Sequence, residues 1–568
     1  MEDKERAMCV ALFFAFLALP PILMLGRVLD TNTLVSWQWT MGEEQPFRIV
    51  FLLLPLLAGA YFLSGDKEPV CSRLLPTAVA AVAALPFLSA AEPVIDAGRY
   101  FLQAKSVAQN GPLFFWQKWG NGIFAWTDLP LVPFVHGLWL AVWGERRIAS
   151  QLLSVLFFAG LVMLTSLLGT ELWHKKTGER AGWLLLASPW LLFLAPAFLV
   201  DIPAAFFVVG ALLFTLRFVK KGRLPDTFPA VFFLSMALLT KYSLWLYLPV
   251  LLAAMVAGQV SRDRWQKTCG RAMTVFLSAL ALPLFFCFTH QESVRAQLRL
   301  LTTFQVAGLA GWDEGFWSAF LFQVHPLVLV MAAVACVTAI RTQEKAAFVC
   351  LAAVLLALFL PTNRIRYLVP LLPLVCLAAA RGLEIFFAAD RVRRFAVQGA
   401  VATSLCVAFA AYLPFARGTA FMNITEAGRL LDRLPGGGGR LLVRSHTAIV
   451  GPHALVPLVD MATEKTLCLE TNERTSATPA SVRASPLRFS WEMDLGGLYR
   501  RCGPNDTHLP RLVVSDTSDG APACPPTARQ TVFAGKTEAF LFQPRVTVFA
   551  VTPATAHTRH TTTQPHVM

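Results

Sequence analysis

The sequence predicts an all-α polytopic membrane protein of about 13 transmembrane helices, followed by a small extracytoplasmic α/β domain. Of the 568 residues, 56% are hydrophobic and only 15% are charged, whereas soluble domains average roughly 45–50% and about 25%. Apolar runs of bilayer-spanning length recur up to residue 415, where the chain turns polar. This pattern excludes a cytosolic enzyme, a disordered protein and a nucleic-acid-binding module.

The candidate spans follow one another with ends placed to about two to four residues. They cover residues 7–29, 46–64, 74–91, 148–170, 181–199, 203–219, 227–240, 242–258, 271–289, 318–340, 346–361, 366–388 and 395–415. The first run has no signal-peptide cleavage site after it. Residues 129–143 (LPLVPFVHGLWLAVW) are also apolar, but counting them as a span would invert every later loop. We interpret them as an interfacial or re-entrant helix.

The basic residues support this path through the membrane. With a cytoplasmic N-terminus, nearly every Lys and Arg cluster falls on the cytoplasmic side, as the positive-inside bias requires. The clusters lie within residues 67–73, 174–180, 217–223, 262–271, 341–345 and 391–394. The net charge of +14 therefore belongs to membrane loops. The other face receives the long loop 92–147 and everything after about residue 416.

The spans and the polar region divide the chain into four parts. These are two N-terminal transmembrane helices (1–73), the main transmembrane domain with its outer loop 92–147 (74–415), an α/β domain (416–552) and a disordered tail (553–568). The α/β domain is predicted from a helix at 425–434 and strands at 440–445, 511–515 and 546–551. An extracytoplasmic location would permit a Cys502–Cys524 disulfide.

Five ionisable residues lie at the outer ends of spans, where charged groups are costly and tend to be functional. They are Asp96 (EPVIDAGRYF), Asp201 (FLVDIPAAFF), Lys241 (LLTKYSLW), and Arg364 with Arg366 (TNRIRYLVPLLP). The predicted topology puts all of them on one face of the membrane. Carboxylates beside a lysine and an arginine pair would suit an anionic, lipid-linked substrate.

These segments resemble the GT-C membrane glycosyltransferases, in particular the bacterial branch with the lipid A aminoarabinose transferase and relatives of the protein O-mannosyltransferases. The matching pieces are Asp96 to Tyr100 followed by GPLFFWQKWGNG, then ERRIASQLLSVLF, LVDIPAAFF, LLTKYSLWLYLP and RIRYLVPLLPL. Together they extend over residues 74–390. Two features depart from the family: Asp96-Ala97 stands where Asp-Glu is frequent, and two spans precede the one that leads into the outer loop.

The resemblance implies an enzyme of a bacterial inner membrane that moves a sugar from a polyprenyl-phosphate donor to a glycolipid of the lipid A type or to a protein. Inversion by single displacement is the expected course. Asp96 would take the proton from the acceptor hydroxyl. Lys241 and Arg366, with Arg364 as the alternate, would hold the phosphate. Asp201 would orient the sugar or the lysine, and Tyr100 would contact the substrate.

The implied chemistry needs no second acid, because the phosphate is already a good leaving group; glycosidases differ in having an alcohol to protonate. No cofactor is assigned, no residue is named as a metal ligand, and a divalent metal remains an option that the resemblance leaves open. The expected partners are the lipid-linked donor, the acceptor and membrane lipids. Nucleic acid is not expected.

Each of these residues also has a structural interpretation. Asp96 could cap the helix after it, and Asp201 could open a helix in the ordinary way because Pro203 follows it. Lys241 could extend to the membrane interface, and the arginines could be membrane-edge anchors.

The main functional rival is a transporter or lipid flippase, although no internal repeat is visible and the charges lie on one face. A lipid-linked glycan ligase would need a large outer loop later in the chain. A non-catalytic assembly protein would tolerate Asp96→Asn.

Overall fold

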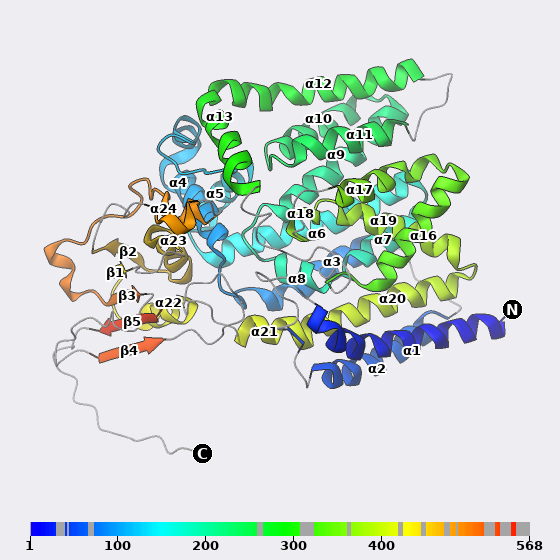
Figure 1. Ribbon diagram of the computed structural model, residues 1–568, viewed down its shortest axis with the longest axis horizontal. Coiled ribbons are helices and arrows are strands. Elements are labelled where there is room, and N and C mark those ends of the chain that lie inside the picture. The colour runs from blue at the N-terminus through cyan, green and yellow to red at the C-terminus, as the bar shows by residue number, and fades with distance from the viewer. Residues whose placement is uncertain are drawn as a thin grey trace.

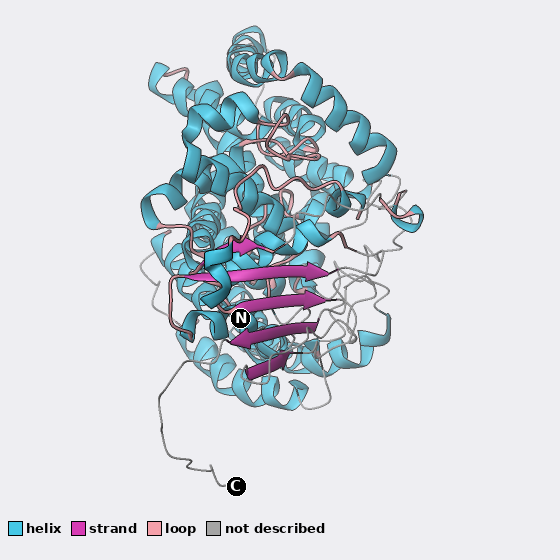
Figure 2. Cartoon of the chain, turned by 90° about the vertical axis from the view of Figure 1, so that its left-hand side faces the viewer, coloured by secondary structure: helices cyan, strands magenta, loops and turns pink. Residues whose placement is uncertain are grey.

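A helical bundle beside a five-stranded sheet makes up the computed structural model (Figures 1 and 2). The structure describes residues 2–29, 40–41, 45–65, 73–257, 265–306, 323–359, 365–418, 424–444, 450–470, 478–483, 487–515, 529–533 and 547–552. Two of the predictions, the role of Arg364 and the disordered tail 553–568, lie outside the described residues.

The bundle contains most of the apolar runs as helices. In chain order they are α1 (Glu2–Gly26), α2 (Gln45–Leu63), α3 (Leu74–Ala84), α4 (Ile95–Lys118), α5 (Leu131–Trp143), α6 (Arg147–Leu172), α7 (Lys175–Leu185), α8 (Pro189–Leu194), α9 (Asp201–Lys221), α10 (Leu224–Leu238), α11 (Leu244–Ala257), α12 (Trp265–Thr289), α13 (Gln291–Leu300), α16 (Pro326–Thr342), α17 (Phe348–Leu358), α18 (Ile365–Leu368), α19 (Leu372–Phe386), α20 (Asp390–Val407) and α21 (Leu413–Gly418). Among the described helices, six are long and apolar enough to cross a membrane: α1, α2, α6, α9, α12 and the continuous segment Asp390–Arg417. The all-α membrane class is therefore confirmed, while the number of spans stays a prediction.

Most side chains of helix α9 are buried, against neighbours that include α6 and α10. Helices α1, α2 and α12 differ from α9, because less than a third of the most apolar stretch of each is buried. Apolar surface of this kind is stable against lipid tails, which are as apolar as the side chains themselves. In Figure 1, α1 and α2 lie along α20 at the edge of the bundle.

Local sequence explains where the expected spans and the observed helices differ. The unbroken span 181–199 is wrong, because α7 ends at Leu185 and α8 begins at Pro189. Proline has no N–H to continue a helix but is well suited to begin one. The expected boundary near Lys241 is confirmed as a turn between α10 and α11. The skipped segment forms α5, which has 13 residues and is shorter than the about 20 that a span requires.

The C-terminal region combines three helices with the sheet. The helices are α22 (Ile424–Arg433), α23 (Pro452–Ala462) and α24 (Arg488–Trp491), and the strands are β1 (Gly438–Arg444), β2 (Thr466–Leu469), β3 (Arg511–Ser515), β4 (Arg529–Phe533) and β5 (Thr547–Thr552). The strand order is β2-β1-β3-β5-β4, with β1 parallel to β2 and β3, and β5 antiparallel to β3 and β4. The predicted helix and the three predicted strands are confirmed, whereas no sequence pattern predicted β2, β4, α23 or α24.

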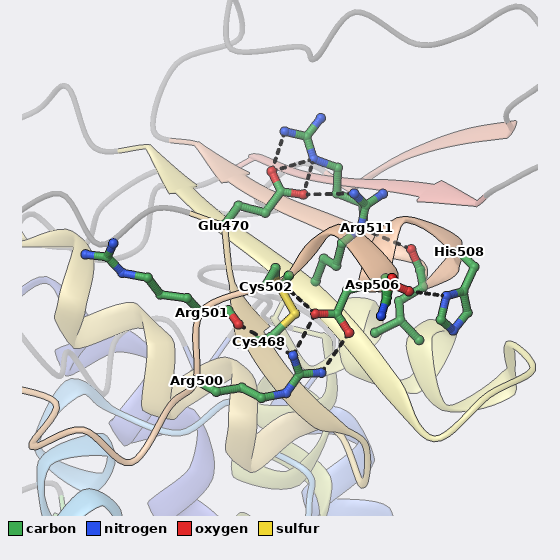
Figure 3. Close-up of a disulfide and its surroundings, with 12 residues drawn as sticks. Cys468, Glu470, Arg500, Arg501, Cys502, Asp506, His508 and Arg511 are labelled. Atoms are coloured by element: carbon green, nitrogen blue, oxygen red, sulfur yellow. Dashed lines mark hydrogen bonds and ion pairs between the residues drawn. A yellow bond between two sulfur atoms is a disulfide. The ribbon is translucent and has the colours of Figure 1, made fainter.

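A disulfide joins Cys468, on β2, to Cys502 (Figure 3). The Cys502–Cys524 disulfide that the sequence left possible is therefore ruled out, because Cys502 is bonded to Cys468. The backbone explains the observed pairing, because the N–H of Cys502 donates to the carbonyl of Leu469 at 2.9 Å and thereby holds the two segments side by side. The two Cα atoms are 5.0 Å apart, within the range that a disulfide can bridge.

Candidate active site

Four of the predicted site residues meet in one ion-pair cluster, although they come from four separate segments. Lys241 Nζ lies 2.8 Å from Asp201 Oδ1. Arg366 Nε lies 3.1 Å from Asp201 Oδ2, and Arg366 Nη1 lies 2.9 Å from Asp96 Oδ2. The positions of Asp96 and Arg366 are 270 residues apart in the chain. We call Asp96, Asp201, Lys241 and Arg366 the ion-pair cluster.

The helix ends show that neither carboxylate in the cluster caps its helix. Helix α4 begins at Ile95 with Val94 as its N-cap, so Asp96 lies within the first turn. Asp201 is the first residue of α9, whose N-cap is Val200. The alternative interpretation, in which Asp96 caps the following helix, is therefore wrong. Both carboxylates accept hydrogen bonds from cationic side chains.

Burial divides the cluster into an inner and an outer part. Asp201 is fully buried, whereas the side chains of Lys241, Arg366 and Asp96 are 17%, 22% and 28% exposed. The ammonium group of Lys241 also lies over the ring of Tyr367, 4.2 Å from its centroid. Asp201 is thus an internal counter-ion that holds two cations, while the cations and Asp96 keep access to the outside.

Two further charged residues extend the cluster, and the sequence analysis did not select them. Arg99 lies one turn after Asp96, with Nη2 3.6 Å from the Asp96 carboxylate. Its Nε and Nη2 approach the two oxygens of Asp128 at 2.7 and 2.9 Å. Burial raises the pKa of Asp128 to about 7, although the Arg99 guanidinium opposes this rise. Arg99 was visible in the segment EPVIDAGRYF, but no periodicity connects it with a loop residue such as Asp128.

Tyr100 is buried beside the cluster and does not face outward. Its ring packs 6.3 Å from the ring of Phe198, and its hydroxyl lies 3.4 Å from Arg99 Nη2. Burial is also the main reason that the pKa of Tyr100 is raised well above its usual value. Substrate contact by Tyr100 remains a prediction, and the contacts that we observe stabilise Arg99.

Metal-ligating side chains gather in one place within the described part of the chain. Cys468, Cys502 and Asp506 have ligand atoms within 4.8 Å of one another. Figure 3 shows why they do not form a metal site: the two sulfur atoms are bonded to each other, and Asp506 pairs with Arg500. The two carboxylates of the ion-pair cluster, Asp96 and Asp201, are paired with the cationic side chains of Lys241 and Arg366 and, among the described residues, are not grouped with other metal-ligating residues.

The chain is similar to known proteins in both sequence and fold. Residues 128–289 match the family described as dolichyl-phosphate-mannose-protein mannosyltransferase. The structure superposes on ArnT from Cupriavidus metallidurans bound to undecaprenyl phosphate with a TM-score of 0.54 and 14% identity, over 84% of this chain and 97% of ArnT. The apo form of ArnT gives a TM-score of 0.53 and 13% identity over the same shares. No match was found among curated proteins.

The oligosaccharyltransferase of Archaeoglobus fulgidus is more distant, with a TM-score of 0.49 and 11% identity over 78% of this chain and 69% of its own. The fold assignment therefore depends on the two ArnT structures, which this chain matches over nearly their full length. The matched family segment includes Asp128, Asp201 and Lys241. The chain has the fold of the GT-C membrane glycosyltransferases and resembles ArnT and the protein O-mannosyltransferases.

Proposed function

We propose that this protein is an integral membrane glycosyltransferase that moves a sugar from a polyprenyl-phosphate donor to a glycolipid or protein acceptor at the extracytoplasmic face. The ion-pair cluster is the observation that carries the proposal, because it combines an accessible carboxylate with two accessible cations. The GT-C fold adds support, since the matching ArnT structure binds undecaprenyl phosphate. The name of the matching family, dolichyl-phosphate-mannose-protein mannosyltransferase, also refers to a lipid-phosphate sugar donor.

The residues would carry out one displacement at the anomeric carbon. The acceptor hydroxyl gives its proton to the Asp96 carboxylate as its oxygen forms the new bond to carbon. The bond from that carbon to the phosphate oxygen breaks on the opposite side, and polyprenyl phosphate leaves with the electron pair. Lys241 and Arg366 stabilise the negative charge that develops on the phosphate. The sugar is therefore transferred with inversion.

Asp201 would act through the two cations and not on the sugar. Its buried carboxylate contacts both Lys241 and Arg366, and a buried carboxylate that accepts two charge-assisted hydrogen bonds fixes its partners firmly. Arg366 also contacts Asp96. Phosphate binding at Arg366 would thus loosen its contact with Asp96 and leave that carboxylate freer to accept a proton.

The location of the site supports an extracytoplasmic reaction. The C-terminal region packs against α4, the helix that carries Asp96, so both are on the same side of the membrane. A disulfide such as Cys468–Cys502 forms and persists in oxidising compartments. We accordingly propose that residues 416–552 form an extracytoplasmic domain, that residues 74–415 form the catalytic membrane domain, and that the protein is located in a bacterial inner membrane.

Purified protein assayed for sugar transfer tests the proposal directly. Polyprenyl-phosphate sugars serve as donors, a host membrane extract serves as acceptor, and release of polyprenyl phosphate is measured. Asp96→Asn should lower the rate by 10²-fold or more, as expected for loss of a general base. Glu464→Gln is the control, because Glu464 is an exposed outer-face carboxylate in a surface pair with Arg146. It should transfer sugar at the wild-type rate.

The outcomes separate the alternatives. Equal rates for Asp96→Asn and wild type would remove Asp96 from the reaction and favour an assembly role. No donor consumption by the wild type with any sugar would overturn the transferase and favour a transporter or flippase. A chelator arm tests the divalent metal, since a metal-dependent enzyme would lose activity with the chelator and regain it with added cation.

A further inference from the structure

One face of α4 is covered by the C-terminal region, beginning directly after Asp96. Gly98, Leu102 and Lys105 are spaced so that they share one side of the helix. A methyl group on Gly98 would come within 2.9 Å of the Leu458 side chain on α23, so the two helices touch there. Leu102 is buried in the same apolar cluster as Leu458. The first three turns of α4 are therefore packed against this region.

A buried polar group lies at the end of this contact. Lys105 Nζ lies 2.6 Å from Asp460 Oδ2, on α23, and 3.1 Å from Glu145 Oε2. The hydroxyl of Tyr499 donates to the same Asp460 oxygen at 2.8 Å. The side chains of Lys105 and Asp460 are only 10% and 9% exposed. We call Lys105, Glu145, Asp460 and Tyr499 the Lys105 cluster.

Buried charges of this kind are costly unless each is paired and hydrogen-bonded. In the Lys105 cluster the lysine has two carboxylate partners, and Asp460 has both the lysine and the Tyr499 hydroxyl. Burial raises the pKa of Asp460, while Lys105 and Tyr499 act against that rise. The arrangement is consequently sensitive to the loss of any one partner, because the remaining charge would stay buried without compensation.

The C-terminal region also contacts the other end of this segment. The Thr425 N–H, in the first turn of α22, donates to Glu92 Oε1 at 3.3 Å, where a carboxylate interacts favourably with the helix dipole. Between the two ends, the Arg99 guanidinium lies 4.8 Å from the ring centroid of Phe489. Residues 92–105 thus have contacts with the C-terminal region on both sides of Asp96.

We propose that the Lys105 cluster positions the Asp96 carboxylate for sugar transfer, with Lys105, Asp460 and Tyr499 acting as positioning residues; this inference depends on the proposed function. Lys105 lies nine positions after Asp96 in the helix, a distance of about 14 Å along the axis. A rigid helix transmits a rotation or shift at one end to the other. A misplacement of about 1 Å can cost 10²-fold in rate, whereas Lys241 and Arg366 come from other segments and would still bind phosphate.

The test compares Asp460→Asn with the wild type in two independent measurements. The first is the kinetics of transfer per folded protein, where kcat should fall 10–100-fold while KM for the donor and binding of bare undecaprenyl phosphate change less than threefold. The second is hydrogen exchange of the α4 amides 95–105, which should become faster. The second measurement needs no sugar transfer, so the inference is tested even if the proposed function fails.

Matched variants exclude a general loss of stability. Glu464→Gln breaks an exposed pair that also joins the outer loop to the C-terminal region, and it should leave both measurements unchanged. Tyr499→Phe removes a single hydroxyl and should lower kcat 3–10-fold. This variant serves as the test if Asp460→Asn does not fold. Lys105→Met added to Asp460→Asn should cost little beyond either change alone, because both break the same contact.

Three results would overturn the inference. One is a kcat within threefold of the wild type for folded Asp460→Asn. Another is an equal loss of kcat and undecaprenyl phosphate binding, which would indicate general damage to the site. The third is unchanged hydrogen exchange in residues 95–105. A wild type without transfer but with the expected exchange change would refute the proposed function and leave the mechanical link in place.

Discussion

Asp201→Asn gives the sharpest test of how the ion-pair cluster works. Asp201 is fully buried and accepts charge-assisted hydrogen bonds from Lys241 at 2.8 Å and from Arg366 at 3.1 Å. Hydrogen bonds to charged groups contribute about 1.5–3 kcal/mol each. Because both cations are partly exposed, we take the lower value for each contact. Losing both would then cost about 3 kcal/mol of positioning free energy, which corresponds to about 100-fold in rate.

Phosphate binding should respond in the opposite sense. The four residues of the ion-pair cluster carry two positive and two negative charges, so Asp201→Asn leaves a net charge of +1. An extra positive charge attracts a phosphate. We therefore expect kcat to fall about 100-fold while the affinity for bare undecaprenyl phosphate stays within threefold of the wild type or increases.

The assay combines donor turnover with undecaprenyl phosphate binding measured by the shift in thermal unfolding. Glu171→Gln is the control, because Glu171 pairs with Arg217 at 2.8 Å near the other end of α9 and is 18% exposed. It should lower the unfolding temperature without lowering kcat per folded protein. A parallel loss of turnover and phosphate affinity in Asp201→Asn would refute the orienting role, as would a turnover above one third of the wild type.

Two further predictions follow from the C-terminal region and the outer loop. Cys468→Ser should destabilise the C-terminal region by about 4 kcal/mol, because Cys502 closes a loop of 34 residues with it; a reductant should lower the unfolding temperature of the wild type but not of the variant, and no effect of reductant would contradict the disulfide. Asp128 has a pKa of about 7 in the fold, above its ordinary value, so the folded state binds its proton more strongly than the unfolded state does. As the pH rises from 5 to 7, the unfolding temperature of the wild type should therefore fall relative to that of Asp128→Asn. A wild-type unfolding temperature that rises relative to that of the variant over this range would contradict the raised pKa.

Sequence patterns were sufficient to select four residues that meet in space. Hydropathy and the positive-inside bias predict that Asp96, Asp201, Lys241 and Arg366 lie on one face of the membrane. Residues that are distant in the chain can come close together when they lie on the same face. Which of these residues form ion pairs was not predictable from the sequence. It depends on the exact positions of short elements such as the α10–α11 turn, which contains Lys241, and the helix α18, which contains Arg366. A helix that started at Ala97 would have Asp96 as its cap, but the helix begins two residues earlier, at Ile95.

The unforeseen parts depend on contacts between the membrane bundle and the C-terminal region. Lys105 lies in a helix of the outer loop and its partner Asp460 lies 355 residues later. Neither residue has a local signal, since a lysine in a mixed helix and an aspartate near a helix end are ordinary surface features. Strand β2 was missed for a similar reason, because its four residues are too short to show alternation. The disulfide partner of Cys502 depended on that strand.

The charges of the site explain both how the fold tolerates them and why they suit a phosphate. Three cations alternate with three carboxylates in one chain of contacts: Lys241, Asp201, Arg366, Asp96, Arg99 and Asp128. When Asp128 is ionised, this alternation leaves the site neutral without substrate, so the cost of burying six ionisable groups is offset pair by pair. A phosphate that arrives at Lys241 and Arg366 would replace the contact between Arg366 and Asp96, while Asp201 keeps both cations in place and no cation is left unpaired. In the proposed reaction, this exchange would release Asp96, the most exposed of the three carboxylates, from Arg366 when the donor is in place. Donor binding would then be linked to the availability of the base.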